Sequence, residues 1–157
     1  MGRAILSVVV GYVVMAIIVA CTFGVLMAIL GADGTYKPGT YWTTNTFNAI
    51  VLAGGTVGAV IGGFICMLIA KSQRPVHVLA GLVLLIGLAS AVMNMGKPDP
   101  TPPAGVPTFE EGSSRGKEPV WFSFTIAIAG PVGLLIGGRL RRSMSRDTVD
   151  AATVPSN

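Results

Sequence analysis

Few residues in this chain could carry out chemistry, and their surroundings argue against it. Four long stretches contain no Asp, Glu, Lys or Arg, and the single histidine, His77, lies near the start of the third. Ionisable residues inside a membrane mark ion or proton pathways, but His77 follows Arg74 and Pro75 so closely that a position at the membrane surface accounts for it. Since no second histidine or carboxylate lies in these stretches, we expect no catalytic residue, no metal site and no cofactor.

The two cysteines, Cys21 and Cys66, are not expected to form a disulfide. On helices of opposite direction their depths would differ by about 20 Å, given the helical rise per residue, which is beyond the reach of a disulfide. We interpret both as small apolar packing residues. The chain also lacks the Cys-x-x-Cys motif of quinone-linked disulfide oxidases and the first-span acid of small multidrug exporters.

Polar uncharged side chains remain as candidates for a substrate path. They are Asn48, Thr56, Ser90 and Asn94. The simpler interpretation is that they form hydrogen bonds between helices, as such side chains do in membranes. A continuous path lined by all of them would instead indicate a transporter or channel.

The composition indicates the medium in which these residues act. The chain has 157 residues, of which 52% are hydrophobic and only 11% are charged, and its mean hydropathy is +0.71. Soluble proteins carry about 25% charged residues, so a soluble enzyme is excluded. The net charge of +4 comes from basic residues beside apolar stretches, which sets membrane orientation and does not indicate a nucleic-acid partner.

The uncharged stretches are long enough to cross a bilayer, which takes about 20 helical residues. They cover residues 4–30, 47–70, 76–95 and 120–138. Backbone groups in hydrocarbon must be paired within their own segment, so each stretch is expected to be helical. The predicted fold class is all-α, a polytopic transmembrane four-helix bundle over residues 1–146, followed by a disordered cytoplasmic tail at 147–157. The short turn at 71–75 predicts that the second and third spans are antiparallel neighbours.

The basic residues predict the orientation of the spans. Seven of the 11 Lys and Arg residues fall on the side of the N-terminus. They are Arg3, Lys71, Arg74, Arg139, Arg141, Arg142 and Arg146. We therefore expect a multi-pass protein of the inner (plasma) membrane with both termini in the cytoplasm and with loops 31–46 and 96–119 outside.

Residues 18–21, Ile-Val-Ala-Cys, also resemble the lipobox of bacterial lipoproteins, in which the cysteine is lipid-modified after signal-peptide cleavage. Residues 22–30 stay apolar, however, whereas a mature lipoprotein normally begins with polar residues. A first membrane span of unusual length is therefore the preferred interpretation.

Small residues recur at helical spacing in three of the four spans. The glycines expected to pack helices closely are Gly54, Gly58, Gly62, Gly63, Gly133 and Gly137. Ala16, Ala20, Gly24 and Ala28 form a similar stripe in the first span. Such glycine-zipper patterns let helix backbones approach each other. We favour packing inside the bundle; a homodimer surface is the alternative.

The glycine segments also suggest an internal duplication. Residues 55–63 align with residues 130–138 at an offset of 75, with six of nine positions identical. Because each unit would contain two spans, the sequence predicts two duplicated helical hairpins of the same orientation. Recurrence of glycine-rich helices in unrelated membrane proteins is the competing explanation.

Arg139, Arg142 and Arg146 follow the last span on one helical face. They are candidates for contact with anionic lipid headgroups. A role as an orientation anchor alone would also explain them.

In layout and glycine pattern, the chain resembles the small, functionally uncharacterised four-span proteins of bacterial inner membranes, a resemblance that implies no functional residue. The abundance of close-packing surface favours a non-enzymatic accessory or scaffold subunit of a membrane assembly. The expected partners are the lipid bilayer and either another membrane protein or a second copy of the chain. The alternative is a small transporter or channel with a path between the two hairpins, and an enzyme would need loop residues such as Glu110, Glu111 and Lys117.

Overall fold

The structure, a computed structural model, describes residues 2–99 and 116–152, apart from the side chains of Ala32 and of residues 144–152. Its long helices are α1 (Gly2–Thr35), α2 (Asn45–Ala70), α3 (Arg74–Met95) and α5 (Val120–Ala152). Each of the four is long and apolar enough to cross a membrane. The predicted all-α four-helix bundle is confirmed, and the chain is a multi-pass membrane protein.

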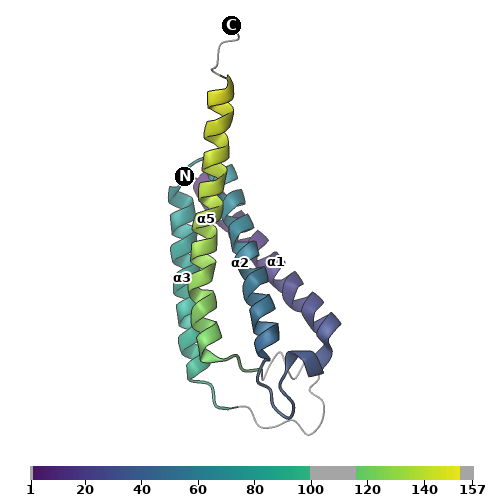
Figure 1. The fold of residues 1–157 in the computed structure, drawn as a ribbon. Coiled ribbons are helices and arrows are strands. Elements are labelled where there is room, and N and C mark those ends of the chain that lie inside the picture. Colours follow the sequence, from purple (N-terminus) through teal and green to yellow (C-terminus); the bar gives the residue numbers. More distant parts are fainter. Residues whose placement is uncertain (1, 100–115, 153–157) are drawn as a thin grey trace.

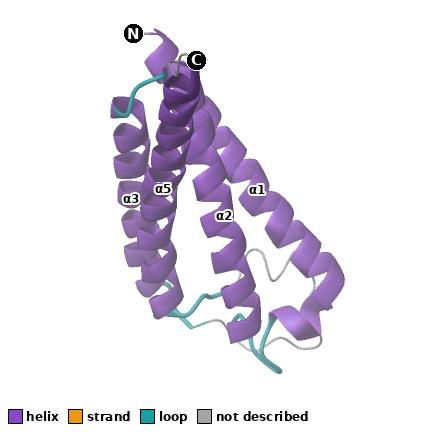
Figure 2. Cartoon of the chain, turned by 45° about the horizontal axis from the view of Figure 1, so that its top comes forward, coloured by secondary structure: helices purple, strands orange, loops and turns teal. Residues whose placement is uncertain are grey.

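The helices stand in a row in the order α1, α2, α5, α3 (Figure 1). The N-terminus, the α2–α3 turn and the end of α5 lie at one end of the bundle, which we call the terminal end; the opposite end is the loop end. α1 meets α3 near the terminal end, where Gly11 faces Leu79. Toward the loop end α1 leans away from α3 (Figures 1 and 2). The bundle is therefore narrow at the terminal end and broad at the loop end.

The prediction that the second and third spans are neighbours is wrong over most of their length. A turn of three residues joins α2 to α3, but α3 packs along α5, and α5 packs along α2. Close helix packing determines this order because α2 and α5 both carry glycines that admit each other's backbone. The short turn constrains only the terminal end.

Two helices extend far beyond the predicted spans, whereas α2 and α3 each begin only two residues earlier than predicted. α1 continues to Thr35, with a break at Gly31, whose φ of 64° and ψ of −171° are readily adopted by glycine. α5 continues to Ala152, so residues 147–152 are helical and the prediction of a disordered tail is wrong there. No Gly or Pro lies between Gly138 and Pro155 to stop the helix; residues 153–157 lie outside the described part.

Two apolar clusters form the core. The cluster near the terminal end contains Cys66, Leu79 and Leu134, and the one near the loop end contains Phe47 and Phe122 with α1 residues packed against them. Both cysteines are free. Cys66 is a packing residue as predicted, but Cys21 is exposed, so the prediction is wrong for Cys21.

Candidate functional site

α2 and α5 approach so closely that glycine is required along their contact. A Cβ added to Gly63 would overlap the backbone carbonyl of Leu134, and a Cβ added to Gly137 would overlap that of Val60. Each helix thus supplies one glycine and, three residues before it, one carbonyl. This reciprocity is that of a local twofold axis between two parallel helices. A Cβ added to Gly133, close to this axis, would lie 2.9 Å from the Cβ of Ala59.

The local twofold axis makes Val60 equivalent to Leu134 and Gly63 equivalent to Gly137, an offset of 74. The sequence repeat has an offset of 75. The helix contact and the repeat are therefore out of register by one residue, and the duplicated-hairpin hypothesis stays a prediction.

A second glycine edge of α2 receives α1. A Cβ added to Gly58 would lie 3.1 Å from the Cγ2 of Ile18, and one added to Gly62 would lie 2.8 Å from the carbonyl oxygen of Gly11. Gly54 faces Thr22 in the same way. The glycines of α2 therefore face two neighbours, with Gly54, Gly58 and Gly62 toward α1 and Gly63 toward α5.

The small-residue stripe of α1 does not pack inside the bundle. We call this stripe, Ala16, Ala20, Gly24 and Ala28, the free face of α1. All its members are exposed, and a Cβ added to Gly24 would meet no atom within 4 Å. The expectation of internal packing is wrong here because a different face of the helix, with Gly11, Ile18 and Thr22, contacts α2.

The four candidate path residues are not brought together. Asn48 is buried on α2, where its Oδ1 accepts a hydrogen bond of 2.9 Å from Thr43. Its Nδ2 is buried and has no hydrogen-bond partner among the described residues. The Thr56 hydroxyl donates to the Leu52 carbonyl of its own helix, whereas Ser90 and Asn94 lie on α3, beyond α5.

Ser90 and Asn94 line a crevice of about 320 Å³ between the loop ends of α3 and α5. Lys97 and Glu118 also line it, and the Asn94 Nδ2 donates to the Glu118 carbonyl oxygen and the Ser123 hydroxyl, both at 3.1 Å. Although the Glu118 side chain reaches solvent, burial of its carboxyl group raises its pKa, and the Lys97 ammonium opposes part of the rise. Neither charged residue was predicted from the sequence as a site residue. Their position just beyond the ends of α3 and α5 was the available signal.

Lys117 contacts several separate segments at the loop end. Its side chain is only 10% exposed, and its Nζ lies 2.8 Å from the Asp99 carboxylate, 2.9 Å from the Lys97 carbonyl oxygen and 5.1 Å from the centroid of the Trp42 ring. Its backbone N–H donates to the Tyr41 carbonyl, and its carbonyl accepts from the Thr43 N–H. We call this set of contacts the Lys117 clasp. It joins the loop after α1 to the segment before α5, a connection between distant residues that no sequence motif indicates. Glu110 and Glu111 lie outside the described residues.

The basic and titratable candidates at the terminal end are mostly exposed. His77 is exposed, with its Nδ1 2.8 Å from the Gln73 carbonyl oxygen. Arg139 and Arg142 are exposed on α5, and the side chain of Arg146 lies outside the described part. Arg139 and His77 border a cavity of only about 70 Å³.

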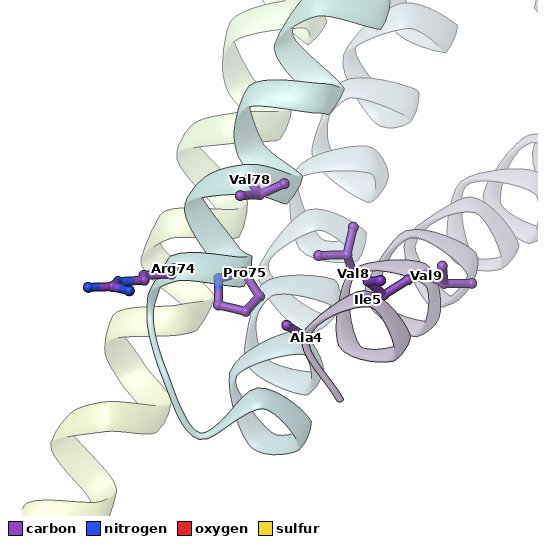
Figure 3. Close-up of a pocket in the computed structure, with 7 residues that line it drawn as sticks. All are labelled: Ala4, Ile5, Val8, Val9, Arg74, Pro75 and Val78. Carbon is purple, nitrogen blue, oxygen red and sulfur yellow. The ribbon is translucent and has the colours of Figure 1, made fainter. Parts of the chain in front are cut away.

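An apolar groove of about 350 Å³ lies between α1 and α3 at the same end. Its walls come from the first turns of both helices, and the guanidinium of Arg74 points away from it (Figure 3). The lining residues are Ala4, Ile5, Val8, Val9, Arg74, Pro75 and Val78. The groove suits hydrocarbon and offers a polar substrate almost nothing to bind.

Among the described residues, no three His, Cys, Asp or Glu side chains gather in a way that could hold a metal ion. Comparison with protein-family models, with curated proteins and with solved structures finds no match.

Proposed function

We propose that this chain is a non-enzymatic accessory or scaffold subunit of an assembly in the inner (plasma) membrane. The observation that carries the proposal is the position of α1 at the end of the helix row. One side of α1 packs against α2, and the free face of α1 is exposed along residues 16–28. A partner transmembrane helix has access to this face along its whole length.

The free face is built like a helix-packing surface that the bundle already uses. Its members repeat every fourth residue, as do Gly54, Gly58 and Gly62, which receive α1. Lipid tails are as apolar as protein side chains, so helices associate in a bilayer through close packing, which small residues permit. A second helix on this face would gain contacts that disordered acyl chains supply less well.

We propose a cytoplasmic location for the terminal end. Arg74 and Arg139 lie there, together with the α2–α3 turn that carries Lys71. Basic residues at the ends of spans favour the cytoplasmic side. The N-terminus and the end of α5 lie at this same end (Figure 1), in agreement with an even number of crossings.

The test is purification of the tagged chain in mild detergent, followed by mass spectrometry of whatever co-purifies and its stoichiometry. Gly24→Leu fills the free face, and Gly81→Leu is the matched control because a Cβ at either glycine meets no atom within 4 Å. We expect the wild type and Gly81→Leu to retain a partner protein at fixed stoichiometry, and Gly24→Leu to lose it while staying folded.

Two results would count against the proposal. A monomer without any partner in all three samples would contradict it. A homodimer that Gly24→Leu dissociates would replace the accessory role by self-association through the same face.

The alternative function, a small transporter or channel, is favoured by the crevice that Ser90 and Asn94 line. A path between the hairpins would have to continue past the glycine contacts of α2 with α5 and past Leu79 and Leu134, which are fully buried. Solute flux into vesicles that contain the purified chain alone would support transport over the accessory role.

A further inference from the structure

The crevice at the loop end combines opposite charges with hydrogen-bonding groups. Lys97 lies just beyond the end of α3, and Glu118 lies just before α5. The Lys97 ammonium attracts the Glu118 carboxylate, but among the described residues neither side chain forms a salt bridge, and the one that is formed there joins Lys117 to Asp99. The crevice therefore presents one cation and one anion that attract each other without forming a direct salt bridge in the described part of the chain.

Some of the polar groups that line the crevice already form hydrogen bonds within the chain. Asn94 uses Nδ2 to donate to the Glu118 carbonyl oxygen and to Ser123. Its Oδ1 remains an acceptor to which no described residue donates, and the Ser90 hydroxyl lines the same cavity.

The level of the crevice in the membrane narrows the class of ligand. The crevice lies where α3 ends at Met95 and α5 begins at Val120. Trp121, the second residue of α5, is 49% exposed. Tryptophan is favoured at the depth of lipid headgroups. Exposed apolar side chains such as Met93 and Ile128 continue from this level along α3 and α5, where acyl chains would lie.

We propose that this crevice binds the zwitterionic headgroup of an aminophospholipid, a primary ammonium joined through a two-carbon link to a phosphate. The ammonium lies against the Glu118 carboxylate and the Asn94 Oδ1, and the phosphate lies against the Lys97 ammonium. Charge-assisted hydrogen bonds of this kind are about twice as strong as neutral ones. The site goes beyond the accessory role and does not depend on it, because it lies on α3 and α5, away from the free face of α1.

The experiment is native mass spectrometry of the purified chain in micelles that contain equal amounts of phosphatidylethanolamine, phosphatidylcholine and phosphatidylglycerol. We expect retention of one phosphatidylethanolamine. Glu118→Gln and Lys97→Gln each remove one charged contact and should lower its occupancy about tenfold. Asp33→Asn and Lys37→Gln are matched controls because these exposed charges lie near the end of α1, outside the crevice, and they should leave occupancy unchanged.

Several outcomes would overturn the proposal. Equal retention of the three lipids, or a preference that survives Glu118→Gln, would show that the crevice does not recognise the headgroup. Preference for phosphatidylglycerol would assign the site to an anion bound by Lys97 alone. Displacement of the lipid by an equal concentration of soluble phosphoethanolamine would retain the recognised chemistry but overturn the membrane lipid as its source. Circular dichroism of each variant verifies that the fold is intact.

Discussion

The close contact between α2 and α5 predicts how the addition of a single methyl group, in a Gly→Ala substitution, changes the stability of the fold. A Cβ at Gly137 would overlap the Val60 carbonyl and lie 2.9 Å from the Phe64 nitrogen, whereas a Cβ at Gly81 would meet no atom within 4 Å. Ordinary carbon contacts are at least about 3.5 Å. In Gly137→Ala the two helices must therefore separate, and backbone atoms on both sides leave no flexible side chain to yield.

The magnitude follows from three contributions. Overpacking in a close-packed interior costs about 1–3 kcal/mol, and we take the upper end because backbone opposes backbone. Separation also weakens Cα–H···O contacts, at about 0.5–1 kcal/mol each. Alanine regains about 1 kcal/mol over glycine in a helix. We expect Gly137→Ala to lower the free energy of unfolding by about 2 kcal/mol, and Gly81→Ala to raise it by up to about 1 kcal/mol.

The assay is reversible unfolding by SDS titrated into mild-detergent micelles, followed by circular dichroism. The difference of about 3 kcal/mol between the two variants corresponds to about two orders of magnitude in the unfolding constant. Gly63→Ala should behave like Gly137→Ala because its Cβ would meet the Leu134 carbonyl. Equal stability of Gly137→Ala and Gly81→Ala would refute the close approach of α2 and α5.

Three further perturbations have expected outcomes in the same unfolding assay or by labelling. Lys117→Met should lower the free energy of unfolding by about 2–4 kcal/mol because a charged hydrogen bond and a cation–π contact are lost. Asp99→Asn should lower it by under about 1 kcal/mol because the Asp99 side chain is 78% exposed. Equal losses for the two variants would contradict the Lys117 clasp. Burial raises the folded-state pKa of Glu118 above its ordinary value of 4.5. The contribution of Glu118 to stability should therefore be fully present below pH 4.5 and be lost as pH rises through the raised pKa, and Glu118→Gln should remove this part of the pH dependence. In the detergent-solubilised chain at alkaline pH, which favours the thiolate, a maleimide should label Cys21 on the surface of the bundle faster than buried Cys66, and faster labelling of Cys66 would contradict this.

The helices themselves follow from the sequence because a single strong constraint defines them. Uncharged stretches must pair their own backbone groups in hydrocarbon, and the third span, expected over 76–95, is a helix over Arg74–Met95. Beyond the hydrocarbon that constraint no longer applies, and the sequence did not predict where the helix ends. The basic run after Gly138 continues α5 to Ala152.

The order in which the helices pack side by side could not be predicted from the sequence. A glycine pattern tells which face of a helix can be approached closely, but not which helix approaches it. The stripe at Gly54 and the stripe at Gly24 have the same spacing, yet α1 covers the first and nothing in the bundle covers the second. Likewise, the burial of Lys117 depends on Trp42 and Asp99, which the chain brings to it from separate loops.

The divergence of α1 from α3 gives the molecule a tapered cross-section, slender where the chain begins and wide where the loops lie (Figures 1 and 2). A tapered inclusion displaces more lipid from one monolayer than from the other. Many copies gathered together would therefore impose a preferred bending direction on the sheet of lipid around them, bulging toward the side on which Lys117 and Trp42 meet.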